Sequence, residues 1–202
     1  MMWKILQYGN FIGTSFYKKA KDIEKDLDEF SKDWKPYNPK KHPGREGLSV
    51  TSLDGGFSGI PDLDSIREYC TENNVELNEM SFNKKTPAAK LLDVYLKPFE
   101  GHIGRSHFIR MDKGGHFPPH RDHMLPEVDT MRLFIPIKNC NPPKTWFMLG
   151  REALTFEPGR AYFINTCIEH TVFSCYPSIF AVLNIKVNDD TIETLLRNMQ
   201  WR

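Results

Sequence analysis

Apolar residues recur at two different spacings along this chain, and the change of spacing divides it into two regions. Residues 16–34 place apolar side chains three and four positions apart: Phe16, Ala20, Ile23, Leu27, Phe30 and Trp34. This spacing predicts an amphipathic helix whose charged residues face solvent. From about Arg105 to Val187 the apolar runs are shorter, rich in β-branched and aromatic residues, and separated by proline, glycine and asparagine. Runs of this kind predict β-strands.

Three further helices are predicted outside the strand-rich region, each from a residue that suits a helix N-terminus. Pro61 fits the first turn of one helix, which would bury one face. Thr86 and Pro87 fit the N-cap and the first position of the next. The last helix, residues 190–202, would start at Asp190 in a variant of the capping box.

Eight strands are predicted between the third and the last helix: Ser106–Met111, Phe117–Asp122, Arg132–Ile137, Thr145–Leu149, Ala153–Phe156, Arg160–Asn165, Thr171–Ser174 and Ile179–Val187. This many short strands, with turn residues about every ten positions, predict a sandwich or barrel, and a double-sheet jelly roll has this strand count. Helices come first, then strands, then one helix. That order argues against alternating βαβ units.

We therefore predict an α+β fold, a cupin-like double-stranded β-helix (jelly roll) with supporting N-terminal helices and a C-terminal helix. The chain would form a single domain over residues 1–202. Residues 1–100 would be a mostly helical covering region. Residues 104–187 would be the jelly-roll core.

The composition narrows the classes of partner. Lys+Arg number 27 and Asp+Glu 26, so the net charge is +1 and shows no basic excess. This balance argues against a nucleic-acid partner. No apolar run approaches the ~20 residues that span a bilayer, so we expect no membrane partner. The first residues lack a signal-peptide pattern, and we expect a cytoplasmic protein.

One group of three residues has side chains and spacing that suit a metal site. His120 and Asp122 stand two positions apart, so in a strand both side chains point to one face while Arg121 points away. His170 follows the strand predicted at Arg160–Asn165 and a short turn. In a rolled-up sheet these two places can lie side by side. Two imidazoles and one carboxylate form the facial triad of non-haem Fe(II) oxygenases, which leaves coordination positions open for oxygen and a co-substrate.

The residues around these three resemble a known family. The matching runs are Phe108-Ile-Arg-Met-Asp-Lys-Gly-Gly-His-Phe-Pro-Pro-His-Arg-Asp122, Arg132-Leu-Phe-Ile-Pro-Ile137, Pro158-Gly159 and His170-Thr-Val-Phe-Ser174. In this order they resemble the aspartyl/asparaginyl β-hydroxylase family of 2-oxoglutarate/Fe(II) dioxygenases, and its small bacterial and phage-type members in particular. The resemblance covers roughly residues 104–187.

The resemblance implies roles for individual residues and shows one departure. His120, Asp122 and His170 match the iron ligands, and Arg132 matches an arginine that contacts 2-oxoglutarate. The family usually has a second arginine ten positions after the distal histidine, where it binds the far carboxylate of 2-oxoglutarate. This chain has Phe180 there. Another cation would have to bind that carboxylate, or the co-substrate differs.

Three cations are candidates for this role. Arg132 is the first, because its guanidinium can bind a carboxylate through two parallel hydrogen bonds. Arg110 is the second and Lys186 the third, although both also fit solvent exposure or a rim ion pair. Within residues 132–137, strand alternation places Arg132 opposite the face of the aliphatic residues. There it needs a partner, either a bound dicarboxylate or an internal Asp or Glu. Arg45 lies in an irregular connection and is interpreted as a solvated loop charge.

The resemblance implies an Fe(II)- and 2-oxoglutarate-dependent dioxygenase. With O2 it would hydroxylate a small-molecule amino acid or an amino-acid residue of a protein. The iron would supply the reactivity while the protein positions the reactants. No catalytic residue beyond the metal ligands is predicted. Two alternatives stay open: a non-catalytic jelly-roll module that binds a metal or ligand, which the Phe180 departure favours, and an oxygenase that does not use 2-oxoglutarate.

Overall fold

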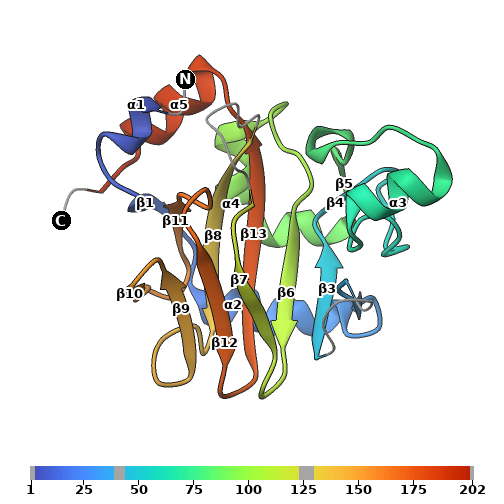
Figure 1. The fold of residues 1–202 in the computed structure, drawn as a ribbon, viewed down its shortest axis with the longest axis horizontal. Helices are drawn as coiled ribbons and strands as arrows, with labels where there is room; N and C mark the ends of the chain where they lie inside the picture. Colours follow the sequence, from blue (N-terminus) through green and yellow to red (C-terminus); the bar gives the residue numbers. More distant parts are fainter. Residues whose placement is uncertain (1–2, 39–43, 123–129, 201–202) are drawn as a thin grey trace.

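A computed structural model describes residues 3–38, 44–122 and 130–200 and shows two antiparallel sheets packed face to face (Figure 1). In spatial order, the large sheet contains β1 (Phe11–Tyr17), β11 (Arg160–Ile164), β8 (Thr130–Lys138), β13 (Ser178–Lys186), β6 (His107–Met111), β3 (Arg45–Ser49) and β2 (Lys35–Pro36). The small sheet contains β10 (Glu152–Ala153), β9 (Thr145–Leu149), β12 (His170–Ser174) and β7 (His116–His120). A separate two-stranded ribbon pairs β4 (Thr51–Ser52) with β5 (Lys84–Lys85). The fold is the predicted double-stranded β-helix.

The strands predicted over residues 106–187 all form, and one is much shorter than expected. The prediction of Ala153–Phe156 is wrong at its end, because β10 stops at Ala153. Leu154 and Phe156 turn into the core and are buried. Asn141 compensates for the lost ladder by bonding both the backbone N–H and the carbonyl of Phe156.

The first hundred residues are not the mostly helical covering region that we expected. They supply β1, β2 and β3 to the large sheet. The single helix predicted over residues 16–34 is wrong at its start, because Phe16 belongs to β1. Ile12, Thr14 and Phe16 alternate between buried and more exposed neighbours, which is the period of a strand at the sheet edge. The jelly-roll core therefore extends beyond residues 104–187.

The helices are few and short: α1 (Trp3–Leu6), α2 (Ala20–Asp26), α3 (Ile66–Asn73), α4 (Asp93–Leu96) and α5 (Asp189–Arg197). The described residues also form the 3-10 helices η1 (Leu27–Phe30), η2 (Glu79–Ser81), η3 (Pro87–Leu92) and η4 (Lys97–Phe99). None of the helices formed by the described residues is long and apolar enough to cross a membrane.

The helix N-termini follow the prediction in one place and differ in two. Thr86 caps η3, where its side chain accepts a hydrogen bond from the Ala88 N–H. The cap of α5 is Asn188 and not Asp190, because Asn188 has the extended backbone of an N-cap and forms a reciprocal capping box with Thr191. The helix expected at Pro61 begins only at Ile66, and none of its side chains is buried.

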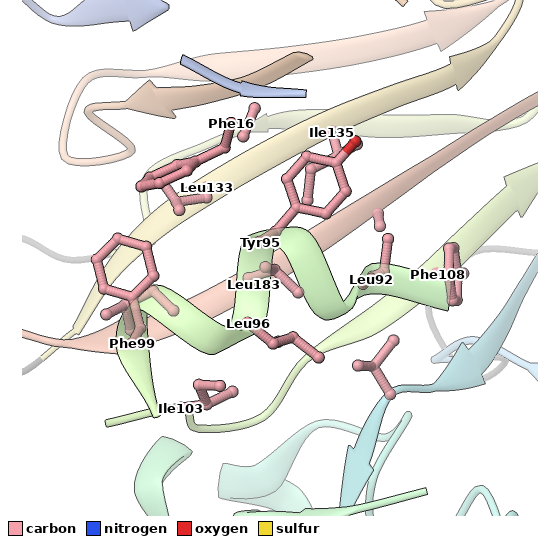
Figure 2. Close-up of a cluster of buried hydrophobic side chains, with 14 of the residues drawn as sticks. Phe16, Leu92, Tyr95, Leu96, Phe99, Ile103, Phe108, Leu133, Ile135 and Leu183 are labelled. Carbon is pink, nitrogen blue, oxygen red and sulfur yellow. The ribbon is translucent and has the colours of Figure 1, made fainter. Parts of the chain in front are cut away.

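The main hydrophobic core lies between the large sheet and the helices on its outer face (Figure 2). Tyr95 and Leu96 of α4 belong to the same buried cluster as Leu133 of β8 and Leu183 of β13, and all four are almost inaccessible to water. The Tyr95 hydroxyl donates to the Gly159 carbonyl at 2.5 Å and accepts from the Lys18 N–H at 3.0 Å. It therefore joins α4 to the turn that precedes β11.

A second, aromatic core fills the space between the two sheets. Phe134 packs with Phe147, Phe156 and Phe180 at ring-centroid distances of 4.8–5.2 Å. Strand alternation separates the two cores as predicted for residues 132–137. Leu133 lies in the helix-side core and Phe134 in the inter-sheet core. The open end of the inter-sheet core is where the chemistry-bearing residues meet.

Candidate metal centre

His120 and His170 lie directly opposite each other in the small sheet. His120 ends β7, His170 begins β12, and the antiparallel register pairs the two residues. Their ring centroids are 4.2 Å apart. Asp122 follows β7 by two residues, and its N–H donates to the Thr166 carbonyl at 3.0 Å. The structure thus brings together the three residues that the sequence singled out, with one ligand atom of each within 4.8 Å of the others.

The hydrogen bonds of the two imidazoles involve their Nδ1 atoms and leave their Nε2 atoms, near Asp122, available to bind a metal. The Nδ1 atom of His120 lies 2.7 Å from the Pro118 carbonyl, and that of His170 lies 3.0 Å from the Ile168 carbonyl. A carbonyl only accepts, so each Nδ1 carries the proton and each Nε2 offers its lone pair. The Nε2 atoms are 3.5 Å (His120) and 3.6 Å (His170) from the Asp122 carboxylate oxygens. This donor set fits a divalent transition metal with open coordination positions.

The electrostatics of the site keep the carboxylate ionised. Burial acts to raise the pKa of Asp122, but the neighbouring Arg132 and His120 hold it well below its usual range. Burial lowers the pKa of His170. The nearby Asp122 carboxylate raises the pKa of His120 against the effect of burial. Asp122 is therefore charged, and His170 is neutral, as metal ligation requires.

The three residues line a cavity of about 380 Å³ between the sheets. Its volume lies in the usual range for small-molecule sites, roughly 300–1,000 Å³. The wall is mixed: Phe117, Phe147, Val172 and Phe180 are apolar, whereas Arg45, Arg105, Arg132, His107 and Asn184 are polar. A small polar ligand that reaches the His–Asp–His cluster would contact both apolar and cationic side chains.

Arg132 lines this cavity, and its ion-pair partner is a carboxylate of the protein itself. One terminal nitrogen pairs with the Asp122 carboxylate, and Nε donates to Asn184 Oδ1 at 3.1 Å. Of the two partners considered from sequence, a dicarboxylate or an internal acid, the internal acid is present. Arg132 thus orients Asp122, and it can touch a ligand only with the nitrogen that these bonds leave over.

Arg110 does not reach the cavity, which corrects its prediction as a co-substrate contact. On β6 it alternates with His107 and Ile109, which line the cavity, so its side chain lies on the opposite face of the sheet. There it pairs with Glu46 at 2.5 Å and packs over Trp34. Lys186, the third candidate, also lies outside the lining of this cavity.

Arg45 is the residue that the sequence interpretation placed wrongly. It begins β3, lines the cavity and is only 4% exposed. An irregular connection was predicted at this position. The structure instead forms β3 here, which puts Arg45 on the same face as Gly47 and Ser49, whereas Leu48 faces the helix-side core.

Three polar residues of the cavity wall carried no recognisable signal in the sequence. Arg105 forms a bidentate ion pair with Glu79, with both N–O distances at 3.0 Å. Glu79 raises the pKa of Arg105 against the effect of burial. Burial and Arg105 hold the pKa of His107 well below its usual range, so this imidazole is neutral. Asn184 joins Arg132 to Glu79 through its side-chain amide.

Comparison with known proteins shows the fold and no family. No protein-family profile matches the chain, and no curated protein matches its sequence. Among solved structures, HygX from Streptomyces hygroscopicus with nickel, 2-oxoglutarate and hygromycin B bound has a TM-score of 0.56 at 8% identity, over 93% of this chain and 87% of HygX. HygX with nickel and 2-oxoglutarate alone gives a TM-score of 0.54 at 8% identity over the same shares. A prolyl-4-hydroxylase from Pseudomonas putida gives 0.49 at 10% identity, over 92% of this chain and 96% of that one. The likeness to HygX shows that the two chains share the double-stranded β-helix fold.

Proposed function

We propose that this protein is an Fe(II)- and 2-oxoglutarate-dependent oxygenase that hydroxylates an amino acid or an amino-acid residue of a protein. His120, Asp122 and His170 would hold the iron. The observation that carries the proposal is their convergence, with ligand atoms within 4.8 Å, on a cavity of a double-stranded β-helix. HygX, which has this fold, binds nickel and 2-oxoglutarate, and this adds support at the level of the fold.

The metal would supply activation of O2 for attack on an unactivated C–H bond. The protein's own residues would do three things. The Pro118 and Ile168 carbonyls orient the imidazoles, and Arg132 holds the Asp122 carboxylate toward them. Apolar walls exclude water from the reacting atoms. No side chain is needed as a general base.

The amino-acid substrate and the aspartyl/asparaginyl β-hydroxylase-like family rest on the sequence resemblance over residues 104–187. The absence of a nucleic-acid partner and the cytoplasmic location rest on composition and the chain's first residues, and they stay predictions. The alternative of a non-catalytic binding module is favoured by one observation, the apolar side chain of Phe180 in the cavity wall.

The test is an anaerobic titration of the metal-free protein with Fe(II) and then 2-oxoglutarate, followed by visible absorption. We expect one Fe(II) per chain and a weak metal-to-ligand charge-transfer band on adding 2-oxoglutarate. His120→Ala and His170→Ala should lose both. Trp146→Ala, on an exposed position of β9, is a control that should keep both.

The outcomes separate the alternatives. Fe(II) binding without the band would point to the binding module or to an oxygenase with another co-substrate. If the metal binds equally well to His120→Ala, or does not bind to the wild type, the assignment of the metal ligands is wrong.

A further inference from the structure

Three arginines line the cavity, and the described residues supply a carboxylate partner to two of them. Arg105 is held by the two carboxylate oxygens of Glu79, and Arg132 is held by Asp122. Among the described residues, no carboxylate lies within ion-pair distance of Arg45. Counted over the described residues, the cavity that contains the candidate metal ligands therefore carries one positive charge without a carboxylate partner.

Arg45 is a buried arginine with no carboxylate partner among the described residues, which is rare in proteins. Its side chain contacts aromatic faces: the guanidinium carbon lies 4.0 Å from the centre of the Phe117 ring and 5.5 Å from that of Tyr37. Its Nε is buried and has no hydrogen-bond partner. Burial lowers the pKa of this guanidinium. Arginine is almost never fully buried unless it is paired, because an unpaired buried charge is costly.

The pairing of β3 with β6 and the packing around Gly47 fix the position of Arg45. The register of β3 with β6 pairs Arg45 with Met111 and Gly47 with Ile109. A Cβ at Gly47 would come within 2.7 Å of Leu63 Cδ2 and 3.2 Å of the Tyr37 ring, so glycine leaves room for Leu63 and Tyr37 to pack over β3. The guanidinium is thus held between packed side chains and faces the cavity.

Arg45 also lies close to Phe180, the position at which the resembled family has its second arginine. Phe180 of β13 pairs with Ile109 of β6, and Gly47 of β3 pairs with Ile109 from the other side. Gly47 is therefore in register with Phe180 across β6, and Arg45, two residues before Gly47, is the next residue of β3 on the same face. The Phe117 ring, which Arg45 covers, lies 6.4 Å from the Phe180 ring and 6.4 Å from the His120 ring.

We propose that Arg45 binds the far carboxylate of 2-oxoglutarate, so that β3 supplies the cation that Phe180 cannot. This inference rests on the proposed function, because the keto acid end of the same molecule would bind the metal. A guanidinium matches a carboxylate with two parallel hydrogen bonds. The bound dianion would neutralise Arg45 and satisfy its unpartnered Nε.

A purely structural role for Arg45, in which it only supports Phe117 and Tyr37, makes a different prediction. The two roles are separated by comparing 2-oxoglutarate with 2-oxobutyrate, a keto acid that can chelate the metal but lacks the far carboxylate. Anaerobic Fe(II)-loaded wild type, Arg45→Met and Arg45→Lys are titrated with each acid, and the charge-transfer band is followed. Arg110→Met, on the other face of the sheet, is the matched control.

We expect Arg45→Met to weaken 2-oxoglutarate binding by about a hundredfold, the usual effect of removing one partner of a buried charge pair. Its affinity for 2-oxobutyrate should stay within about twofold of the wild type. Arg45→Lys should recover part of the loss, and Arg110→Met should behave as wild type. An equal loss of both acids, no loss, or a loss of 2-oxoglutarate binding in Arg110→Met would overturn the assignment of Arg45.

The wild type alone provides a second test if Arg45→Met does not fold. An uncompensated cation in the cavity requires Fe(II)-loaded wild type to prefer 2-oxoglutarate over 2-oxobutyrate by about a hundredfold. Equal affinities would refute the role of Arg45 while leaving the proposed function standing. If neither acid produces a band although Fe(II) binds, the proposed function itself fails.

Discussion

At the scale of single residues, the candidate site depends on arginines whose roles are set by their partners. Arg132 and Arg45 both face the cavity. Arg132 pairs with the Asp122 carboxylate, whereas among the described residues Arg45 contacts aromatic rings and no carboxylate. Arg132 therefore belongs to the support of the metal ligands. Arg45 is available to a ligand.

Removing the support of Asp122 should weaken metal binding without abolishing it. In Arg132→Met the carboxylate loses its ion pair and is free to turn away from the two histidines. We expect the Kd for Mn(II), measured by electron paramagnetic resonance of the free ion, to rise by about 10- to 100-fold, as for other partners of metal ligands. Arg110→Met should leave it unchanged. An unchanged Kd in a folded Arg132→Met protein would show that Asp122 needs no partner.

A second buried acid should make stability depend on pH. Asp62 is 1% exposed, and burial raises its pKa to about 6. The folded state thus holds the proton more tightly than the unfolded state does. Its contribution is fully present below about pH 4 and is lost as the pH rises through about 6.

Asp62→Asn should remove this loss. We expect the variant to be more stable than wild type at pH 7.5, by at most about 3 kcal/mol, and the difference to vanish near pH 4. Urea unfolding at both pH values measures it. An Asn variant that is less stable than wild type at pH 7.5 would mean that the ionised carboxylate is well satisfied in the folded protein.

At the scale of elements, the N-terminal part of the chain completes the sheet that carries the site. β3 pairs with β6 and brings Arg45 to the cavity, and β1 pairs with β11 and forms one edge of the sheet. Helices α2, α4 and α5 contribute buried side chains to the core that also contains Leu133 of β8 and Leu183 of β13 (Figure 2 shows α4), and none of their residues lines the cavity.

The hydrogen bonds of the Tyr95 hydroxyl should contribute measurably to the free energy of unfolding. Tyr95→Phe keeps the packing of α4 but leaves the Gly159 carbonyl and the Lys18 N–H with one partner fewer. We expect the free energy of unfolding in urea to fall by about 1–2 kcal/mol. Tyr176→Phe, at an exposed position, should have no effect. If both variants unfold at the same urea concentration, this junction contributes nothing.

At the scale of the whole molecule, the metal ligands tie together segments far apart in sequence. His120 and Asp122 flank the end of β7, and His170 begins β12, which also pairs with β9. A bound ion would therefore fasten the open end of the small sheet. A ligand that binds only the folded state stabilises it by mass action.

Metal addition should raise the melting temperature, and its removal should reverse the effect. At a concentration of 100 times Kd, the stabilisation is about 2.7 kcal/mol. For a chain of this length that corresponds to roughly 5–10 °C. Circular dichroism melts with Mn(II), with and without a chelator, measure the shift. His170→Ala should show none, and a shift of equal size in that variant would place the binding ion elsewhere.

The order and period of the strands over residues 106–187 were readable from the sequence because alternation along a strand is a local property. The spacing of His120 and Asp122 was readable for the same reason. The burial of Arg45, the ion pair between Arg132 and Asp122, and the placing of Arg110 on the outer face depend on which strands pair and in which register. These pairings join residues tens of positions apart, so only the tertiary structure decided them.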